Sequence, residues 1–172
     1  LEDGQKRDAL EKLEQARQAI RLATGDVRRA IDQLMDESPL RIGLAEQIQT
    51  LALDFGRKHD LAVEWRNLIN GAAPYTRQTW EQILHITREA LKNASSHANA
   101  SHVTVQMRQA DDHYFVMVED NGKGFDASAP EPKGHFGLQI MQARAAHIGG
   151  KIEIESVKGL GTKVTLIWPS AG

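Results

Sequence analysis

Three short segments decide the fold: Arg88-Glu-Ala-Leu-Lys-Asn93, Asp120-Asn-Gly-Lys-Gly-Phe125 and Gly137-Leu-Gln-Ile-Met141. The first segment carries carboxylate and amide oxygens, and the second follows a strand pattern and contains two glycines. The third begins a helical pattern with a glycine. Glycine allows sharp turns and close approach of a ligand, and the free amides at a helix start favour phosphate. Together the segments predict separate subsites for a metal ion, a base and a phosphate.

The composition fits one soluble globular domain of ordinary size with length left for an appended element. The 172 residues are 41% hydrophobic and 26% charged, as in typical folded domains. No stretch approaches the roughly 18 to 20 apolar residues needed to span a bilayer. The net charge of -2 and the lack of a long basic block predict no nucleic-acid partner. Cysteine is absent, which excludes disulfides and Cys-type zinc sites.

The N-terminal region carries a heptad pattern. Apolar residues recur every seven positions, at Leu13, Ile20, Val27 and Leu34. This spacing predicts a helical stem over residues 1–37, which packs either on its own domain or as a dimerisation stem. Gly25 costs about 1 kcal/mol relative to alanine inside a helix, so a bend is expected there. Because the chain begins with Leu1 rather than methionine, we interpret it as a piece of a longer protein.

Residues 38–172 are predicted to form a second domain of the α+β class. Segments with a 3.6-residue apolar period predict helices, and alternating segments around polar turns predict antiparallel hairpins. Helices on one face of a mixed, mostly antiparallel sheet would make a two-layer sandwich. The expected elements are a helix from Ser38-Pro39 to about His59, a strand over 61–65, a helix from Thr76 to about His97, a hairpin of strands 103–108 and 114–119, a helix over 137–147, and a hairpin of strands 151–155 and 162–168.

The helix from Thr76 carries a polar row at four-residue spacing: His85, Glu89, Asn93 and His97. Such a row shares one helix face, and a solvated face is the better interpretation for His85 alone. Mg²⁺ prefers oxygen ligands and takes few of them from protein when phosphates complete its shell, which suits Asn93. Glu89, one turn earlier, suits a general base. A zinc site is disfavoured because no third histidine or cysteine stands at ligand spacing.

Asp120 stands at the predicted end of a strand and opens the turn Asn121-Gly-Lys-Gly124. A lone Asp-x-Gly-x-Gly is most often only a turn. A buried carboxylate, however, accepts hydrogen bonds and donates none, so it would favour the amino group of adenine over the carbonyl of guanine. Asp120 is therefore a candidate base-reading residue.

Two glycines, Gly134 and Gly137, flank an aromatic residue directly before a predicted helix. A structural turn explains Gly134 alone, but the pair ahead of an amphipathic helix favours a phosphate loop. The eleven residues 126–136 are long for a connection in a compact domain and predict a mobile lid. Near the last strand, the hydroxyl of Thr162 could reach the base directly or through water, although hairpin chemistry explains Gly161-Thr162 as simply.

In this order, the segments Glu89-xxx-Asn93, Asp120-x-Gly-x-Gly124, Gly137-Leu138 and Gly161-Thr162 resemble the N, G1, G2 and G3 boxes of the GHKL ATP-binding superfamily. Within it, Arg-Glu-Ala-Leu-Lys-Asn followed by His97-Ala98 most resembles the catalytic domain of sensor histidine kinases of the nitrate/nitrite-sensor type. The resemblance covers roughly residues 61 to 169 and implies a Bergerat-type sandwich that binds ATP and Mg²⁺.

The resemblance also implies a role for individual residues of this chain. Glu89 and Asn93 would be catalytic, and Asn93 would hold Mg²⁺ together with phosphates and water. The nucleotide-binding residues would be His97, Asp120 on adenine, Gly122 and Gly124 around the base and ribose, Gly134, Gly137 and Leu138 near the phosphates, and Thr162 by the purine. Ser96 stands where many relatives carry a basic residue, which puts charge compensation beside His97 in question.

In such kinases the γ-phosphate passes to a histidine on a dimeric helical hairpin and then to an aspartate of a response-regulator receiver domain. All seven histidines lie from His59 onward, so the stem over 1–37 resembles only the second helix of that hairpin. The implied partners are therefore ATP, a response regulator and a phosphoacceptor helix outside this fragment. The full-length protein is expected to be a homodimer, with this part as the cytoplasmic domain of an inner-membrane sensor.

Three other functions stay open from the sequence. The chain could be an ATP-binding module that signals without phosphotransfer. It could also be another GHKL enzyme, either an anti-sigma-type serine kinase or a water-using ATPase. A general α+β interaction domain would bind no nucleotide at all.

Overall fold

The computed structural model describes residues 43–69, 76–126 and 137–170. The predicted stem over 1–37 lies outside these ranges. None of the described helices is long and apolar enough to cross a membrane. The elements follow in the order α2 (Leu44–His59), β1 (Ala62–Leu68), α3 (Arg77–Ser96), β2 (His102–Ala110), β3 (His113–Asp120), α4 (Gly137–His147), β4 (Lys151–Val157) and β5 (Gly161–Pro169).

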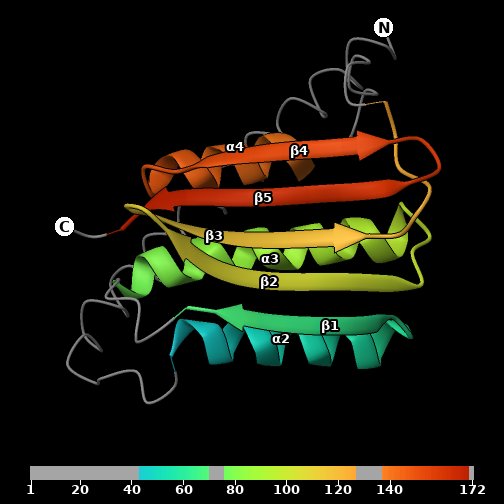
Figure 1. The fold of residues 1–172 in the computed structure, drawn as a ribbon, viewed down its shortest axis with the longest axis horizontal. Coiled ribbons are helices and arrows are strands. Elements are labelled where there is room, and N and C mark those ends of the chain that lie inside the picture. The colour runs from blue at the N-terminus through green and yellow to red at the C-terminus, as the bar shows by residue number, and fades with distance from the viewer. Residues whose placement is uncertain (1–42, 70–75, 127–136, 171–172) are drawn as a thin grey trace, which may run out of the picture. The chain divides into compact units, whose positions relative to one another are not determined.

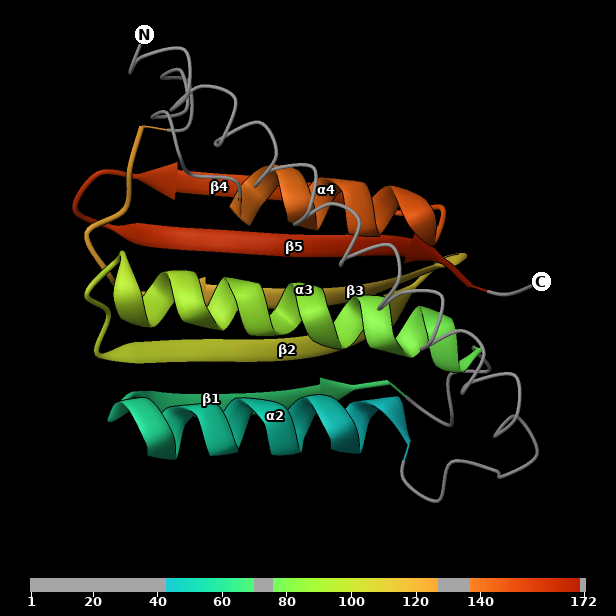
Figure 2. The ribbon, with the colours of Figure 1, turned by 180° about the vertical axis from the view of Figure 1, so that it is seen from behind.

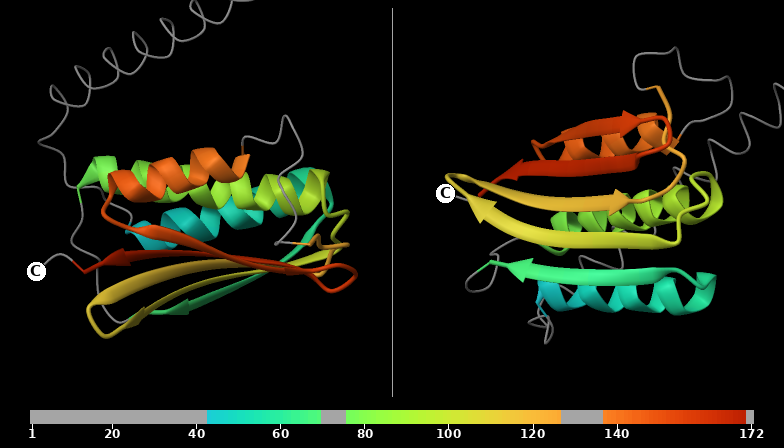
Figure 3. Two further views of the ribbon diagram at one scale, coloured as in Figure 1. Left: turned by 90° about the horizontal axis from the view of Figure 1, so that it is seen from above. Right: turned by 45° about the vertical axis from the view of Figure 1, so that its right-hand side comes forward.

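The strands form one sheet in the order β1-β2-β3-β5-β4 (Figure 1). β1 and β2 are parallel, and the other neighbours are antiparallel. A parallel pair needs a crossover connection, which α3 supplies. The described helices α2, α3 and α4 lie side by side on one face of the sheet (Figures 2 and 3). The predicted two-layer α+β sandwich with a mixed, mostly antiparallel sheet is confirmed.

The core lies between these two layers. Residues 103, 105 and 107 of β2 are 0% exposed, and the residues between them face outward, as the alternation of a strand requires. On β5 the largest fully buried side chain is Trp168, which is 1% exposed. The helical contribution comes mainly from the buried stripe of α3: Trp80, Ile83, Ile86, Thr87, Ala90, Leu91 and Ala94.

The ends of two elements differ from the sequence-based expectation. Gly43 has extended backbone and is the N-cap of α2, so that helix begins at Leu44 and does not continue back to the predicted start at Ser38-Pro39, which lies outside the described residues. β1 continues to Leu68 instead of ending at residue 65, because it pairs with β2 along its whole length. Pairing with a neighbour extended this strand through polar residues that carry no strand signal.

The helices that border the site have the predicted ends. The side chain of Thr76 accepts a hydrogen bond from the N–H of Thr79 at 3.2 Å and caps α3, and His97 is its C-cap. After α4, Gly149 has a φ of +68° and the N–H of Gly150 donates to the carbonyl of Ala145 at 2.9 Å. Glycine in this conformation is a common helix stop.

Candidate functional site

The predicted site elements meet at one end of the sandwich, on the right in Figure 1 and on the left in Figure 2. There α3 ends, α4 begins and β3 ends at Asp120. The adjacent strand β5 begins at Gly161, and its second residue, Thr162, stands opposite Asp120 in the β3–β5 register. Segments that lie far apart in the sequence therefore come together here.

Asp120 is the one charged side chain that is buried among the described residues, with 8% exposure. Its Oδ1 accepts a hydrogen bond from the N–H of Gly122 at 2.8 Å. Burial raises the pKa of the Asp120 carboxyl, although hydrogen bonds from the backbone of Gly122 and Thr162 act in the opposite direction. A buried carboxylate needs hydrogen-bond donors, and its remaining lone pairs can accept from a ligand amino group.

The loop after Asp120 is packed tightly against the β4–β5 hairpin. Gly124 has a φ of +55°, and a Cβ there would overlap the carbonyl oxygen of Val157. The N–H of Phe125 donates to the hydroxyl of Ser156 at 2.9 Å. Position 124 therefore requires glycine, both for its backbone conformation and for its close approach to the end of β4.

The start of α4 faces the polar row of α3. A Cβ on Gly137 would lie 2.9 Å from a carboxylate oxygen of Glu89, and 3.7 Å and 3.8 Å from the side-chain nitrogen and oxygen of Asn93. The ammonium of Lys92 lies 3.8 Å from the Glu89 carboxylate. The Glu89 carboxylate and the Asn93 carboxamide thus stand next to the first amides of a helix, a combination suited to a cation and phosphate together.

The remaining predicted site residues lie in different surroundings. His97 is exposed, and its backbone N–H donates to the carbonyl of Asn93 at 3.0 Å. The side chain of Leu138 packs against the core. Gly134 lies outside the described residues, as does the predicted lid over 126–136 apart from Asp126.

Two residues that the sequence did not mark as functional tie this region together. The Asn121 side chain bonds to the backbone at the start of β2. The Ser156 hydroxyl donates to the carbonyl of Gly161 at 3.1 Å and lies 2.9 Å from the hydroxyl of Thr162. Ser156 carries no sequence signal, because its contacts depend on the register between β4 and β5.

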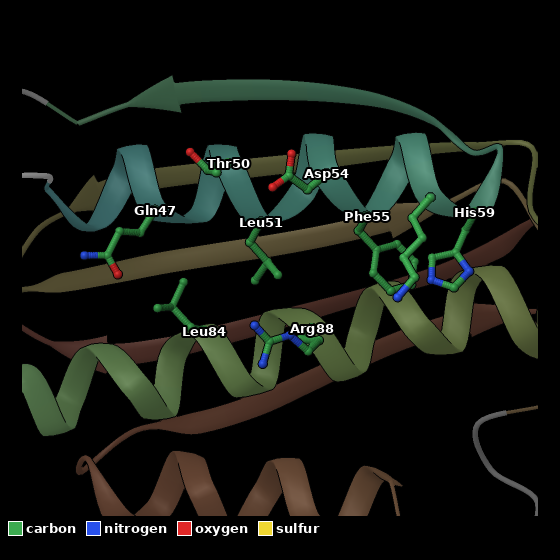
Figure 4. A pocket seen from close by; sticks show the side chains of 9 residues that line it. Gln47, Thr50, Leu51, Asp54, Phe55, His59, Leu84 and Arg88 are labelled. Atoms are coloured by element: carbon green, nitrogen blue, oxygen red, sulfur yellow. The ribbon is translucent and has the colours of Figure 1, made fainter.

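A separate groove of about 570 Å³ lies between α2 and α3 (Figure 4). Leu51 and Phe55 of α2 and Leu84 and Arg88 of α3 line it, and the rings of Phe55 and His59 stack with centroids 4.2 Å apart. The groove lies on the α2 side of α3, whereas Gly137 approaches α3 from α4. It contains none of the predicted site residues, so it is distinct from the site above.

Among residues 43–69, 76–126 and 137–170, no group of three or more His, Asp or Glu side chains is arranged to hold a metal ion.

Residues 79–172 match the family described as "Histidine kinase-, DNA gyrase B-, and HSP90-like ATPase". The chain belongs to this family. The match includes the polar row of α3, the end of β3, the start of α4 and the start of β5. Every predicted site residue therefore lies within the matched range.

Several relatives with curated names are sensor proteins. The nitrate/nitrite sensor protein NarQ of Escherichia coli is 33% identical over 84% of this chain and 22% of its own length. The sensor histidine kinase LiaS of Bacillus subtilis is 34% identical over 74% of this chain and 34% of its own length. The chain therefore spans about a fifth to a third of these relatives.

Solved structures agree on the fold. The histidine kinase domain of a blue-light activated histidine kinase from Erythrobacter litoralis superposes with a TM-score of 0.61 at 23% identity. The superposition covers 75% of this chain and 62% of that one. The five-stranded sheet with helices on one face is thus shared with a histidine kinase domain.

Proposed function

We propose that this chain is the ATP-binding catalytic module of a two-component sensor histidine kinase. The observation that carries the proposal is the meeting of a buried carboxylate, Asp120, with the Glu89–Asn93 row and the start of α4 at one end of the sandwich. Membership of the ATPase family and the names of the relatives support it. We assign residues 38–172 to the catalytic domain and 1–37 to the stem.

The base would bind at the end of β3. Asp120 would accept a hydrogen bond from the adenine amino group, and the hydroxyl of Thr162 would contact the purine directly or through water. The backbone of Gly122 and Gly124 would border the base and ribose. Guanine presents a carbonyl where adenine presents an amino group, so Asp120 would reject GTP.

The phosphates would bind between α3 and α4, with Gly134 and His97 as further contacts. Asn93 would contribute one oxygen to Mg²⁺, since an amide oxygen is a ligand this ion accepts. Gly137 and Leu138 would offer backbone N–H groups to the phosphates. Mg²⁺ would neutralise charge on the phosphates when bound.

The reaction would transfer the γ-phosphoryl group to a histidine nitrogen on a hairpin outside this chain, with ADP as the leaving group. Glu89 would accept the proton from the nucleophile or orient it, as a general base within reach. The phosphohistidine would then pass its phosphoryl group to an aspartate of a response-regulator receiver domain. We place this module on the cytoplasmic side of a dimeric membrane sensor.

Calorimetric titration with Mg-ATP and Mg-GTP tests the assignment of the site. The wild type should prefer ATP. Asn93→Ala should lose the dependence of ATP binding on Mg²⁺, because it removes the protein oxygen from the metal shell. Asp120→Asn should lose ATP selectivity by about 100-fold, since a donor replaces an acceptor in a buried site. Equal binding of both nucleotides by all three proteins would overturn the assignment.

Phosphotransfer to a separate hairpin polypeptide tests the reaction. The wild type with labelled ATP should label a folded hairpin that carries the phosphoacceptor histidine. ATP binding without labelling would indicate a signalling module that lacks the chemistry. Rapid ATP hydrolysis without an acceptor would indicate a water-using ATPase instead.

A further inference from the structure

Asn121 follows the proposed base-reading residue and makes an extended set of hydrogen bonds. Its Oδ1 accepts from the N–H groups of Ser101 and His102, both at 3.0 Å. Its Nδ2 donates to the hydroxyl of Ser101 at 3.0 Å. Its backbone N–H donates to the carbonyl of His102 at 3.2 Å. One residue thus ties the end of β3 to the connection between α3 and β2.

The same connection is tied to the proposed metal ligand. The backbone N–H groups of His97 and Ala98 both donate to the carbonyl of Asn93 at 3.0 Å. The carbonyl of Ala98 accepts from the N–H of Lys123 at 2.8 Å. A Cβ on Gly122 would lie only 2.5 Å from the Cβ of Ala98. Contacts therefore run continuously from Asn93 through Ala98 to the loop that follows β3.

Strand pairing does not extend into this loop. The β2–β3 and β3–β5 registers both end at Asp120, so Asn121 is the first residue beyond the paired strands. Its side chain satisfies two consecutive amides at the start of β2 that would otherwise need other partners. At the end of the paired strands, the side chain of Asn121 thus adds three hydrogen bonds to the one that its backbone N–H makes with His102.

We propose that Asn121 is a positioning residue that sets the spacing between the carboxylate of Asp120 and the side-chain amide of Asn93. This inference rests on the proposed function, in which these two groups hold opposite ends of one nucleotide. Adenosine occupies the base end alone, whereas Mg-ATP must satisfy both ends at once. A change in their spacing therefore weakens Mg-ATP binding and spares adenosine binding.

Three variants separate positioning from general stability. Asn121→Ala removes all the side-chain bonds. Asn121→Asp retains them, because its carboxylate accepts from both N–H groups and from the Ser101 hydroxyl, which can turn to donate. Asn67→Ala is the matched control: the Asn67 side chain accepts from the N–H of Ile69 at 3.2 Å, and Asn67 pairs with Met107, away from the site end of β2.

Calorimetry with Mg-ATP, adenosine titration followed by NMR, and thermal unfolding provide the readouts. Asn121→Ala weakens Mg-ATP binding about tenfold, which is the loss expected when one hydrogen bond between the protein and the charged nucleotide is misplaced. The same variant changes the affinity for adenosine by less than about twofold. Asn121→Asp stays within about threefold of the wild type for Mg-ATP. Asn67→Ala lowers the unfolding midpoint and leaves both affinities unchanged. If Asn121→Ala does not fold, Ser101→Ala, which removes one bond, shows a loss of about threefold for Mg-ATP.

Two results would overturn the positioning role. One is unchanged Mg-ATP binding by the alanine variant at position 121, and the other is an equal loss of adenosine and Mg-ATP binding. Failure of the wild type to bind Mg-ATP would instead overturn the proposed function on which the role depends.

Discussion

Asp120 and Glu89 are carboxylates at the same end of the sandwich, but their surroundings differ. Asp120 is 8% exposed and already accepts a backbone hydrogen bond from Gly122 at 2.8 Å. The Glu89 side chain is 28% exposed, and its cationic neighbour Lys92 is 57% exposed. The carboxylate at the proposed base end is thus buried, whereas the carboxylate at the proposed phosphate end is partly exposed.

This difference separates two kinds of residue. At the base end, the groups that would read the nucleotide also hold the fold together, because the loop after β3 packs on Ala98, just after α3, and on the β4–β5 hairpin. At the phosphate end, Gly137 approaches the flexible side chain of Glu89. Filling the space at Gly124 should therefore damage stability at the first end, whereas filling it at Gly137 should damage ligand binding at the second.

Of the substitutions considered below, Gly124→Ala should have the largest effect on stability. The new Cβ would overlap the carbonyl oxygen of Val157, and the φ of +55° is unfavourable for alanine. Strain and overpacking together should destabilise the fold by about 3 kcal/mol, measured by chemical unfolding. Gly159→Ala is the control, because Gly159 has a φ of +85° and nothing within 4 Å of the added atom. The free energy of unfolding of this control should fall by only about 1 kcal/mol. Equal losses for the two variants would contradict tight packing at the base end.

A smaller effect, on binding alone, is expected for Gly137→Ala. The added Cβ would lie 2.9 Å from the Glu89 carboxylate, which can move, so the free energy of unfolding should change by less than about 0.5 kcal/mol. The methyl group would crowd the proposed phosphate subsite and weaken Mg-ATP binding about tenfold, or about 1.4 kcal/mol. Gln142→Ala, at an exposed position of α4, should bind normally. If Gly137→Ala lost much stability and bound Mg-ATP normally, the proposed difference between the two ends would be contradicted.

The smallest effect is a pH dependence of stability at Asp120. Burial raises the pKa of this carboxyl in the folded state, so the unfolded chain loses this proton at lower pH than the folded one. The contribution of this group to the free energy of unfolding is therefore fully present below the usual pKa of an aspartate, and it is lost as the pH rises through the raised pKa. Unfolding of the wild type and Asp120→Asn should show a relative advantage of the variant near pH 7 that shrinks as the pH is lowered towards 4. A constant difference would contradict a buried, titrating Asp120.

Much of this architecture could be predicted from the sequence, because its signals are local. The apolar period of α3 and the alternation of the two hairpins gave their positions within a few residues, and Thr76 marked a helix start. The order of the motifs predicted the family. The predicted lid over 126–136 stays a prediction, because only Asp126 of that range lies among the described residues.

What the sequence did not predict depends on contacts between distant segments. β1 continues through Arg66 and Asn67 because β2 pairs with it, not because those residues favour a strand. Asn121 accepts a hydrogen bond from the backbone N–H of Ser101, which lies 20 residues away in the sequence, and no local pattern links the two residues. Ser156 meets Thr162 only through the register of the last hairpin.

Amide chemical-shift mapping of the wild type with adenosine and, separately, with Mg-tripolyphosphate tests the two-ended site most directly. Adenosine should shift the amides of residues 120–124 and 161–162. Mg-tripolyphosphate should shift those at the start of α4, from Gly137 onward, and the side-chain amide of Asn93. Shifts of one shared set by both probes, or shifts confined to the groove between α2 and α3, would contradict this account.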